Sequence, residues 1–272
     1  PPPVPPRYAH AEDVIVYKEP GVYGCFPSLV RLDDTTFFTS FGTRTRRSHI
    51  DSTGGSARYV SRDQGYTWEP YDGEWPMGGY MLNEDGSLAD ARAYGWRQVA
   101  AERRQEFAEQ DITVRDVRPG VVAYLQGAYA RRSEDGGKTW DRWDLQLPAH
   151  RSLMNYNASS QLRLSNGVLL HTIYGELKED TATRTFILRS ADDGLTWWFL
   201  PLAADPAGEV RFNETALCEN ADGEVIAMMR SEPPAGGYLR LSISQDSGIT
   251  WSPPCLLYTS DAADEEDSVD LG

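Results

Sequence analysis

The chain of 272 residues contains 11% aromatic residues and 24 glycines, a composition typical of a turn-rich all-β protein. The formal net charge of −15 argues against a nucleic-acid partner, which binds to basic surfaces, and no apolar run approaches the roughly 20 residues of a membrane span. The cysteines Cys25, Cys218 and Cys255 are too scattered for a disulfide framework or a metal site, so we predict no metal and no cofactor.

Residues 13–18 (DVIVYK) alternate in hydrophobicity, which predicts a strand ahead of the repeated part of the chain. Similar short apolar segments follow, each bounded by turn residues. The further segments predicted as strands are 27–32, 35–42, 56–62, 67–71, 79–82, 91–100, 121–132, 159–164, 167–175, 183–190, 196–202, 214–219, 224–231, 238–244 and 250–254. Residues 101–110 (AERRQEFAEQ) have a helix-like composition instead.

One octapeptide pattern, Ser-x-Asp-x-Gly-x-Thr-Trp, occurs four times, at 61–68, 133–140, 190–197 and 244–251. Its Asp can accept backbone N–H groups of the same loop, and its Gly provides a position with positive φ. The Thr-Trp pair then re-enters a strand, where the indole can be buried between neighbouring sheets. The last two intervals each fit one propeller blade of roughly 40–50 residues with modest loops, and the longer first interval predicts an insertion.

This octapeptide resembles the Asp-box (BNR) repeat of the sialidase superfamily, and the resemblance runs from about Val14 to Pro254. Members of that superfamily are β-propellers, so the resemblance implies an all-β propeller of the sialidase type with four of six blades in this chain. The implied blades lie near residues 26–71, 72–147, 154–203 and 212–254 of a partial propeller domain at 1–254.

Each such antiparallel blade contains four strands, called A to D in chain order. Their alternating directions place functional residues on one face. The start of A, the end of B and the B–C loop share that face, whereas the C–D turns with the Asp boxes lie on the other. We therefore predict that the boxes are structural and that the site lies at the opposite end. The candidates at that end are Arg44, Asp51, His171, Tyr174, Glu214 and Arg230.

Arginines and carboxylates at one end suit an anionic sugar, because a guanidinium group binds a carboxylate through two hydrogen bonds. Sialidases use an arginine triad, an acid/base Asp and a Tyr nucleophile activated by a Glu. The resemblance implies that Asp51 is the acid/base, Glu214 the activator, Arg230 a carboxylate ligand and Arg44 a sugar contact. It places the Tyr and a third Arg in later blades, beyond Pro254.

One departure concerns the first triad arginine. The segment Phe26–Val30 resembles the end of the family motif R-I-P-S-L-V, but Cys25 occupies the place of its Arg. A thiol cannot hold a carboxylate, so the identity of the acidic sugar stays open. The candidates also have structural interpretations: Asp51 as a loop cap, Glu214 and Arg230 as an ion pair, and His171 as a core histidine.

The resemblance implies that the parent protein is an exo-acting, retaining glycoside hydrolase that acts on a terminal acidic sugar. A polysaccharide lyase on the same propeller is one alternative, with His171 or Tyr174 removing a proton beside a uronate carboxylate. A non-catalytic propeller that binds glycans or proteins is another. Fold alone does not decide between the three.

The last segment, residues 255–272 (CLLYTSDAADEEDSVDLG), has no hydrophobic periodicity and no basic residue. It looks like the translation of a sequencing adapter, and the alternative is a natural acidic tail. We expect the native part of this chain to end at Pro254, so that the chain is a fragment of a longer protein. We also expect this four-blade fragment to be inactive by itself.

Overall fold

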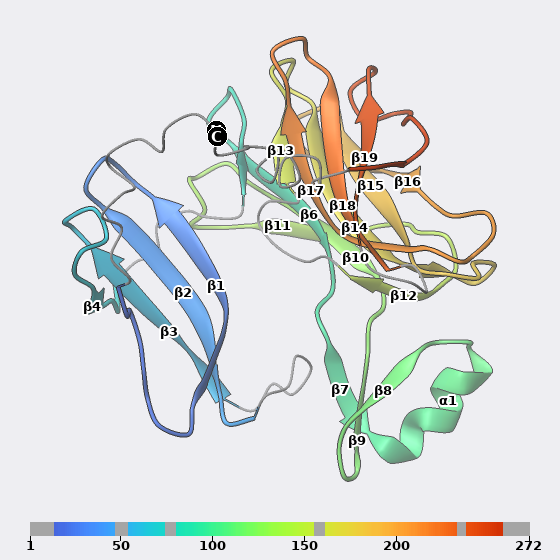
Figure 1. The fold of residues 1–272 in the computed structure, drawn as a ribbon, viewed down its shortest axis with the longest axis horizontal. Helices are drawn as coiled ribbons and strands as arrows, with labels where there is room; N and C mark the ends of the chain where they lie inside the picture. Colours follow the sequence, from blue (N-terminus) through green and yellow to red (C-terminus); the bar gives the residue numbers. More distant parts are fainter. Residues whose placement is uncertain (1–13, 47–53, 74–79, 155–160, 233–237, 258–272) are drawn as a thin grey trace, which may run out of the picture. The chain divides into compact units, whose positions relative to one another are not determined.

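The computed structural model describes residues 14–46, 54–73, 80–154, 161–232 and 238–257. The described residues form an all-β protein that divides into two units, residues 1–78 and 79–272. Figure 1 shows the strands of both units. The predicted all-β class is confirmed, whereas the number of blades stays a prediction.

The first unit contains one antiparallel sheet in the order β1-β2-β3-β4. Its strands are β1 (Tyr23–Arg31), β2 (Phe37–Arg44), β3 (Gly54–Ser61) and β4 (Glu69–Pro70). The strand predicted at 13–18 was wrong for its described part, because residues 14–18 adopt no strand. Instead of pairing, this segment packs the Tyr17 ring on Phe41, with ring centroids 5.2 Å apart.

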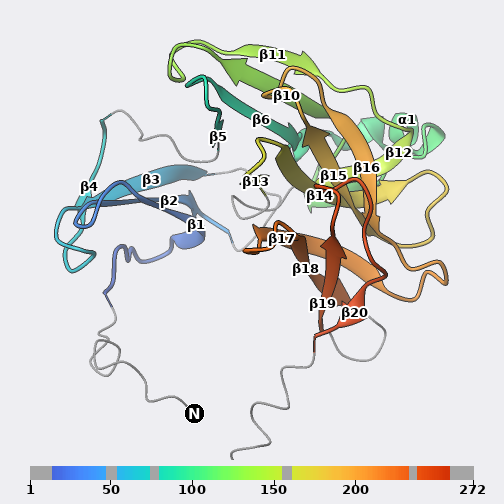
Figure 2. The ribbon, with the colours of Figure 1, turned by 90° about the horizontal axis from the view of Figure 1, so that it is seen from above.

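The second unit contains three successive antiparallel sheets with the strand orders β11-β10-β6-β5, β12-β14-β15-β16 and β17-β18-β19-β20, here called the second, third and fourth sheets. Figure 2 shows them one beside the next. Their strands are β5 (Met81–Leu82), β6 (Leu88–Ala93), β10 (Ala128–Ser133), β11 (Asp141–Asp144), β12 (His150–Met154), β13 (Gln161–Arg163), β14 (Leu169–Leu177), β15 (Arg184–Ser190), β16 (Trp198–Ala203), β17 (Arg211–Glu219), β18 (Val225–Glu232), β19 (Leu239–Ser244) and β20 (Cys255–Leu256).

The last strand of the fourth sheet differs from its prediction. Residues 250–254 form no strand, and β20 at Cys255–Leu256 pairs with β19 instead. Pro253 and Pro254 lack the N–H group that a ladder hydrogen bond requires, which explains why pairing begins after them.

An insertion lies between β6 and β10 of the second sheet and carries a small sheet of order β7-β9-β8. Its elements are β7 (Arg97–Ala100), the 3₁₀ helix η2 (Ala101–Arg103), α1 (Arg104–Glu109), β8 (Val114–Arg118) and β9 (Val121–Tyr124). The helix predicted at 101–110 is confirmed. The single strand predicted at 121–132 was wrong, because Gly127 at φ +80° separates β9 from β10.

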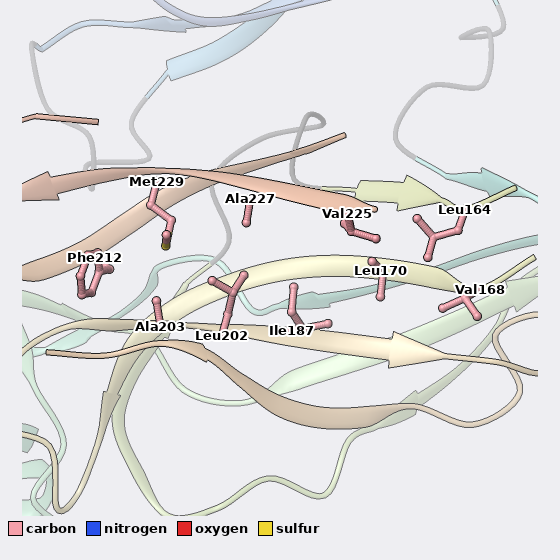
Figure 3. Packing of buried hydrophobic residues seen from close by; sticks show 10 residues of the cluster. All are labelled: Leu164, Val168, Leu170, Ile187, Leu202, Ala203, Phe212, Val225, Ala227 and Met229. Carbon is pink, nitrogen blue, oxygen red and sulfur yellow. The ribbon is translucent and has the colours of Figure 1, made fainter. Parts of the chain in front are cut away.

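Apolar side chains fill the space between the sheets of the second unit. Figure 3 shows side chains from the third sheet facing those from the fourth; the cluster comprises Leu164, Val168, Leu170, Ile187, Leu202, Ala203, Phe212, Val225, Ala227 and Met229. Between the second and third sheets, alanines of β6 and β10 meet Ile173, Phe186 and Leu188. Small residues on one sheet and large ones on the other allow a close approach.

The Asp boxes are closed by their own hydrogen bonds. In the first box the Asp63 carboxylate accepts the backbone N–H of Thr67 at 2.9 Å and its hydroxyl at 2.6 Å. The Ser61 hydroxyl accepts the N–H of Gly65 at 2.8 Å, and the Trp68 indole donates to the Gly65 carbonyl at 2.9 Å. The other three boxes repeat the bonds of the Ser, Asp, Gly and Thr, and the indole bond recurs in two of them at 3.0 Å.

These bonds occupy the box carboxylates. In the second box, hydrogen bonds from the Thr139 hydroxyl, the Thr139 N–H and the Ser133 hydroxyl lower the pKa of Asp135 to about 2. A carboxylate held ionised by its own turn is poorly suited to accept or give a proton near neutral pH. The prediction that the boxes are structural therefore agrees with their geometry.

The box turns also bind the preceding sheet. The Asp193 carbonyl of the third box accepts the side chains of Asn83 at 3.0 Å and Arg132 at 3.2 Å, both from the second sheet. In the same way, the Ser247 carbonyl of the fourth box accepts Arg189 of the third sheet at 2.9 Å. The boxes of the second, third and fourth sheets consequently lie on one side of the unit.

Glycine is required where these turns meet the neighbouring sheet. Gly194 has φ +83°, and a Cβ there would lie 2.4 Å from the Cβ of Ala89. Gly248 also has φ +83°, and a Cβ there would lie 2.8 Å from Leu170. The box glycine thus provides both the left-handed turn and the room for contact between sheets.

Candidate functional site

The strand register places Glu214 and Arg230 at the end of the fourth sheet that is opposite its Asp box. Val225 pairs with Ser244 at the end from which the box follows. Asn213 pairs with Arg230 at the other end. We call this other end of each sheet the rim, and the predicted separation of Glu214 from the fourth box is confirmed.

Glu214 lies on a strained part of β17. The pairing of β17 with β18 is irregular between Asn213 and Ala216, and Glu214 has φ 42° inside this bulge. A non-glycine residue in the left-handed region costs free energy, and such residues concentrate at functional sites. The bulge aims the Glu214 side chain out of the regular strand alternation.

A buried threonine cluster, with two members from the third sheet, holds this bulge. The Thr172 hydroxyl donates to the Thr215 carbonyl at 2.8 Å, and the hydroxyls of Thr185 and Thr215 lie 3.0 Å apart. All three side chains are buried. Because Thr215 follows Glu214 directly, these bonds fix the backbone that carries the carboxylate.

Arg230 lies between two carboxylates. Its guanidinium group is 3.3 Å from the carboxylate of Glu214 and 2.7 Å from that of Glu232. The Asn213 amide also donates to Glu232 at 3.2 Å. The Arg230 side chain is 52% exposed and that of Glu214 26% exposed, so solvent and small anions reach the pair. Exposed ion pairs of this kind contribute little stability, so a ligand carboxylate can replace one partner at low cost.

The first unit repeats the bulge of β17. The pairing of β1 with β2 is irregular between Cys25 and Ser28, and Phe26 inside this bulge has φ 54°. Arg44, the last residue of β2, lies over the Phe26 ring with 5.9 Å between the guanidinium carbon and the ring centroid. The Cys25 thiol is buried, in the position where the resemblance expects an arginine.

Asp51 lies outside the described residues. Its predicted convergence with Glu214 and Arg230 stays a prediction, as does the role of Arg44. The ion pair that the sequence analysis gave as the structural interpretation of Glu214 and Arg230 is present, and their roles in a site stay predictions as well.

His171 lies inside the packing of the third sheet. It is the third residue of β14, opposite Leu188, and is 1% exposed. Neither ring nitrogen has a hydrogen-bond partner among the described residues. Burial, with a smaller effect of the Arg92 charge, lowers the pKa of His171 to about 3. The ring therefore stays neutral above that pH, and we assign it no contact with substrate.

Tyr174 lies three residues further along β14, towards the rim, where it pairs with Met154 and Thr185. It is partly exposed and lines a pocket beside the insertion. Of the two candidates on this strand, Tyr174 is thus the one that a ligand can reach.

Sequence reasoning missed Glu232 and the threonine cluster. Glu232 follows Arg230 by two residues on one strand, so period-two alternation places both side chains on the same face and could have revealed it. The threonines come from three strands on two sheets, and no local signal connects them.

Within the described ranges, no group of three His, Cys, Asp or Glu side chains is arranged to hold a metal ion. In the same part of the chain, no helix combines the length and apolar character needed to cross a bilayer.

Family models match two parts of the chain. The model for the BNR repeat-like domain matches residues 116–271, and the model for the BNR/Asp-box repeat matches residues 59–70. No curated protein matches the chain.

Several solved structures share the fold. A protein of unknown function from Dyadobacter fermentans DSM 18053 is 25% identical with a TM-score of 0.63, and the match covers 89% of this chain and 71% of that one. The intramolecular trans-sialidase from Ruminococcus gnavus is 15% identical with a TM-score of 0.50, covering 87% and 71%. The NanB sialidase from Streptococcus pneumoniae is 15% identical with a TM-score of 0.53, covering 90% of this chain and 54% of the sialidase.

Proposed function

This chain belongs to the BNR repeat-like domain family of the sialidase superfamily, and on that premise we propose that its parent protein is an exo-acting, retaining glycoside hydrolase that releases a terminal acidic sugar. The observation that carries this proposal is the exposed Arg230 guanidinium group beside Glu214 at the rim, with Glu214 on a left-handed bulge. The parent protein is the full gene product that contains this chain.

The proposed roles follow from the chemistry of each side chain. Arg230 binds the sugar carboxylate, because its exposed guanidinium group can exchange an ion pair with Glu232 or Glu214 for one with the ligand. Asp51 protonates the leaving oxygen as the glycosidic bond breaks and later deprotonates the attacking water. Glu214 accepts the proton of a tyrosine from a later blade as that tyrosine attacks the anomeric carbon.

The proposal names an acidic sugar and not a particular one. The trans-sialidase and the sialidase act on sialic acid as their names say, but at 15% identity they support the fold alone. The buried thiol of Cys25 removes one arginine that the resemblance expects. A site without this arginine departs from the sialidase triad, so other acidic sugars such as uronic acids are candidates beside sialic acids.

The lyase alternative has less support. A proton-abstracting base must reach the carbon beside the uronate carboxylate, and His171 is 1% exposed. Of the two bases proposed for the lyase, only Tyr174 is exposed enough to reach a substrate. A lyase would release an unsaturated sugar, which distinguishes it from a hydrolase in the same assay.

Replacing Asp51 or Glu214 in the parent protein tests the proposal. We expect Asp51→Asn and Glu214→Gln each to lower kcat on a fluorogenic glycoside of sialic or uronic acid by about 100-fold, the lower end of the range for acid–base residues. Thermal unfolding should change little, because both replacements preserve shape. Initial rates and melting temperature are the measurements.

Glu134→Gln is the matched control. Glu134 is an exposed carboxylate in the second Asp box, on the side away from the rim, so its replacement should leave kcat unchanged. Full activity in the Glu214→Gln variant, or release of an unsaturated sugar by the wild type, would exclude the proposed mechanism. Binding of acidic sugars without turnover by the parent would favour a glycan-binding propeller.

A further inference from the structure

The insertion of the second sheet is fastened to the third sheet at the rim. It leaves β6 after Ala93 and returns at Ala128, and these two residues pair at the rim end of their strands. Arg151 of β12 donates to the Asp111 carboxylate at 3.0 Å, and the Thr113 N–H donates to the Arg151 carbonyl at 3.1 Å. These bonds therefore hold the insertion against the third sheet.

A second group of bonds holds the other end of the insertion. The Gln126 amide donates to the carbonyls of His150 at 3.1 Å and Arg151 at 2.9 Å. The Gly127 N–H donates to the His150 imidazole at 3.0 Å. The segment that returns from the insertion to the second sheet is thus tied to the third sheet as well.

A pocket of about 90 Å³ lies between the insertion and the third sheet. The insertion contributes Trp96, Thr113 and Arg115, and the Arg115 guanidinium carbon lies 5.4 Å from the Trp96 ring centroid. The third sheet contributes Tyr174 and Glu176. The pocket combines two aromatic side chains, one charge of each sign and the hydroxyl groups of Thr113, Ser152 and Thr183.

The pocket adjoins the strand that carries Glu214. Thr183 lines the pocket, and its hydroxyl donates to the Glu176 carboxylate at 2.9 Å. The Thr183 carbonyl accepts the N–H of Phe212 at 2.9 Å, and Phe212 lies two residues before Glu214. The pocket therefore lies at the same end of the sheets as Glu214 and is joined to the start of its strand through Thr183.

The lining fits a neutral, polyhydroxylated ligand. Arg115 and Glu176 balance each other in charge, so the pocket offers no excess of positive charge to a carboxylate. Aromatic faces pack well against the C–H groups of a sugar ring, while hydroxyl and carboxylate groups bond its hydroxyls. A space of this volume holds about three water molecules, which suits one edge of a sugar ring.

We propose that this pocket is a second saccharide subsite, which binds the neutral sugar to which the terminal acidic sugar is attached. Trp96 and Arg115 of the insertion are then specificity-determining residues. The inference rests on the proposed function for the order of the two sugars, but the pocket's affinity for a neutral sugar can be measured without catalysis.

The test compares two substrates of the parent protein, a lactose-linked trisaccharide and an aryl glycoside of the same acidic sugar. Trp96→Ala should lower kcat/KM on the trisaccharide about 10-fold, the effect of losing one interface aromatic, and leave the aryl glycoside within about twofold. Thr113→Val, which removes only a hydroxyl, should act in the same direction. Trp198→Ala is the matched control, because Trp198 is 64% exposed and follows the third Asp box.

Direct binding of lactose, followed by saturation-transfer NMR, separates this inference from the proposed function. If the parent cleaves neither substrate but binds lactose, and Trp96→Ala abolishes that binding, the subsite stands and the hydrolase proposal fails. If wild-type protein does not bind lactose, or if both variants lose the same factor on both substrates, the subsite is refuted.

Discussion

Lowering the pH from 7 to 3 is expected to destabilise the folded chain by roughly 4 kcal/mol through His171. The pKa of this buried ring falls from 6.5 to about 3 on folding, and each pKa unit corresponds to about 1.4 kcal/mol. Between pH 6.5 and about pH 3, the ring binds a proton in the unfolded chain but not in the folded chain. The stability contribution is therefore complete above pH 6.5 and is lost as the pH falls towards 3.

Urea unfolding at a series of pH values measures this loss. His171→Leu removes the titrating ring and should flatten the dependence between pH 6.5 and 4. The box carboxylates act at lower pH, since the pKa of Asp135 falls from 3.8 to about 2 and its contribution is lost only below about 4. An equal slope in wild type and His171→Leu above pH 4 would contradict the burial of a neutral histidine.

Replacing Trp197 by alanine is expected to lower the free energy of unfolding by about 3 kcal/mol. Its ring packs against the core between the second and third sheets and against the cluster of Met81, Ala89 and Leu169. Its indole also donates to the Gly194 carbonyl at 3.0 Å. Truncation of a large aromatic in a core costs about 3–5 kcal/mol, and Trp197 is partly buried, which favours the lower value.

The neighbouring Trp198 provides the control for the same chemical change. Its side chain is 64% exposed, so Trp198→Ala should change stability by less than about 0.5 kcal/mol. Denaturant unfolding of both variants is the measurement. Similar losses for both variants would contradict the assignment of the box tryptophan as a contact between sheets.

The Asp boxes could be predicted in detail because their interactions are local. The side-chain hydrogen bonds that close the first box join residues between Ser61 and Trp68, so the octapeptide alone was enough to predict them. The opposite placement of Glu214 followed from strand order in the same way. What the sequence could not reveal was that the box turns bind the preceding sheet through Arg132 and Arg189.

The remaining features depend on segments that are distant in sequence. The burial of His171 results from packing between neighbouring sheets, and its position on a predicted strand was equally compatible with exposure. The bulge at Glu214 is held by Thr172 and Thr185 of another sheet. The insertion was predicted from the interval between boxes. Its pocket could not be predicted, because it depends on contacts that Arg151 of the third sheet makes with the insertion.

The central claim is that the rim around Glu214 and Arg230 binds and cleaves an acidic sugar. A crystal structure of the parent protein with its acidic sugar product bound tests this claim most directly. We predict the sugar carboxylate on the Arg230 guanidinium group, with Glu214 and Asp51 both lining the same cavity. A product bound at the Asp-box ends of the sheets, or Asp51 on the side away from Glu214, would contradict the claim.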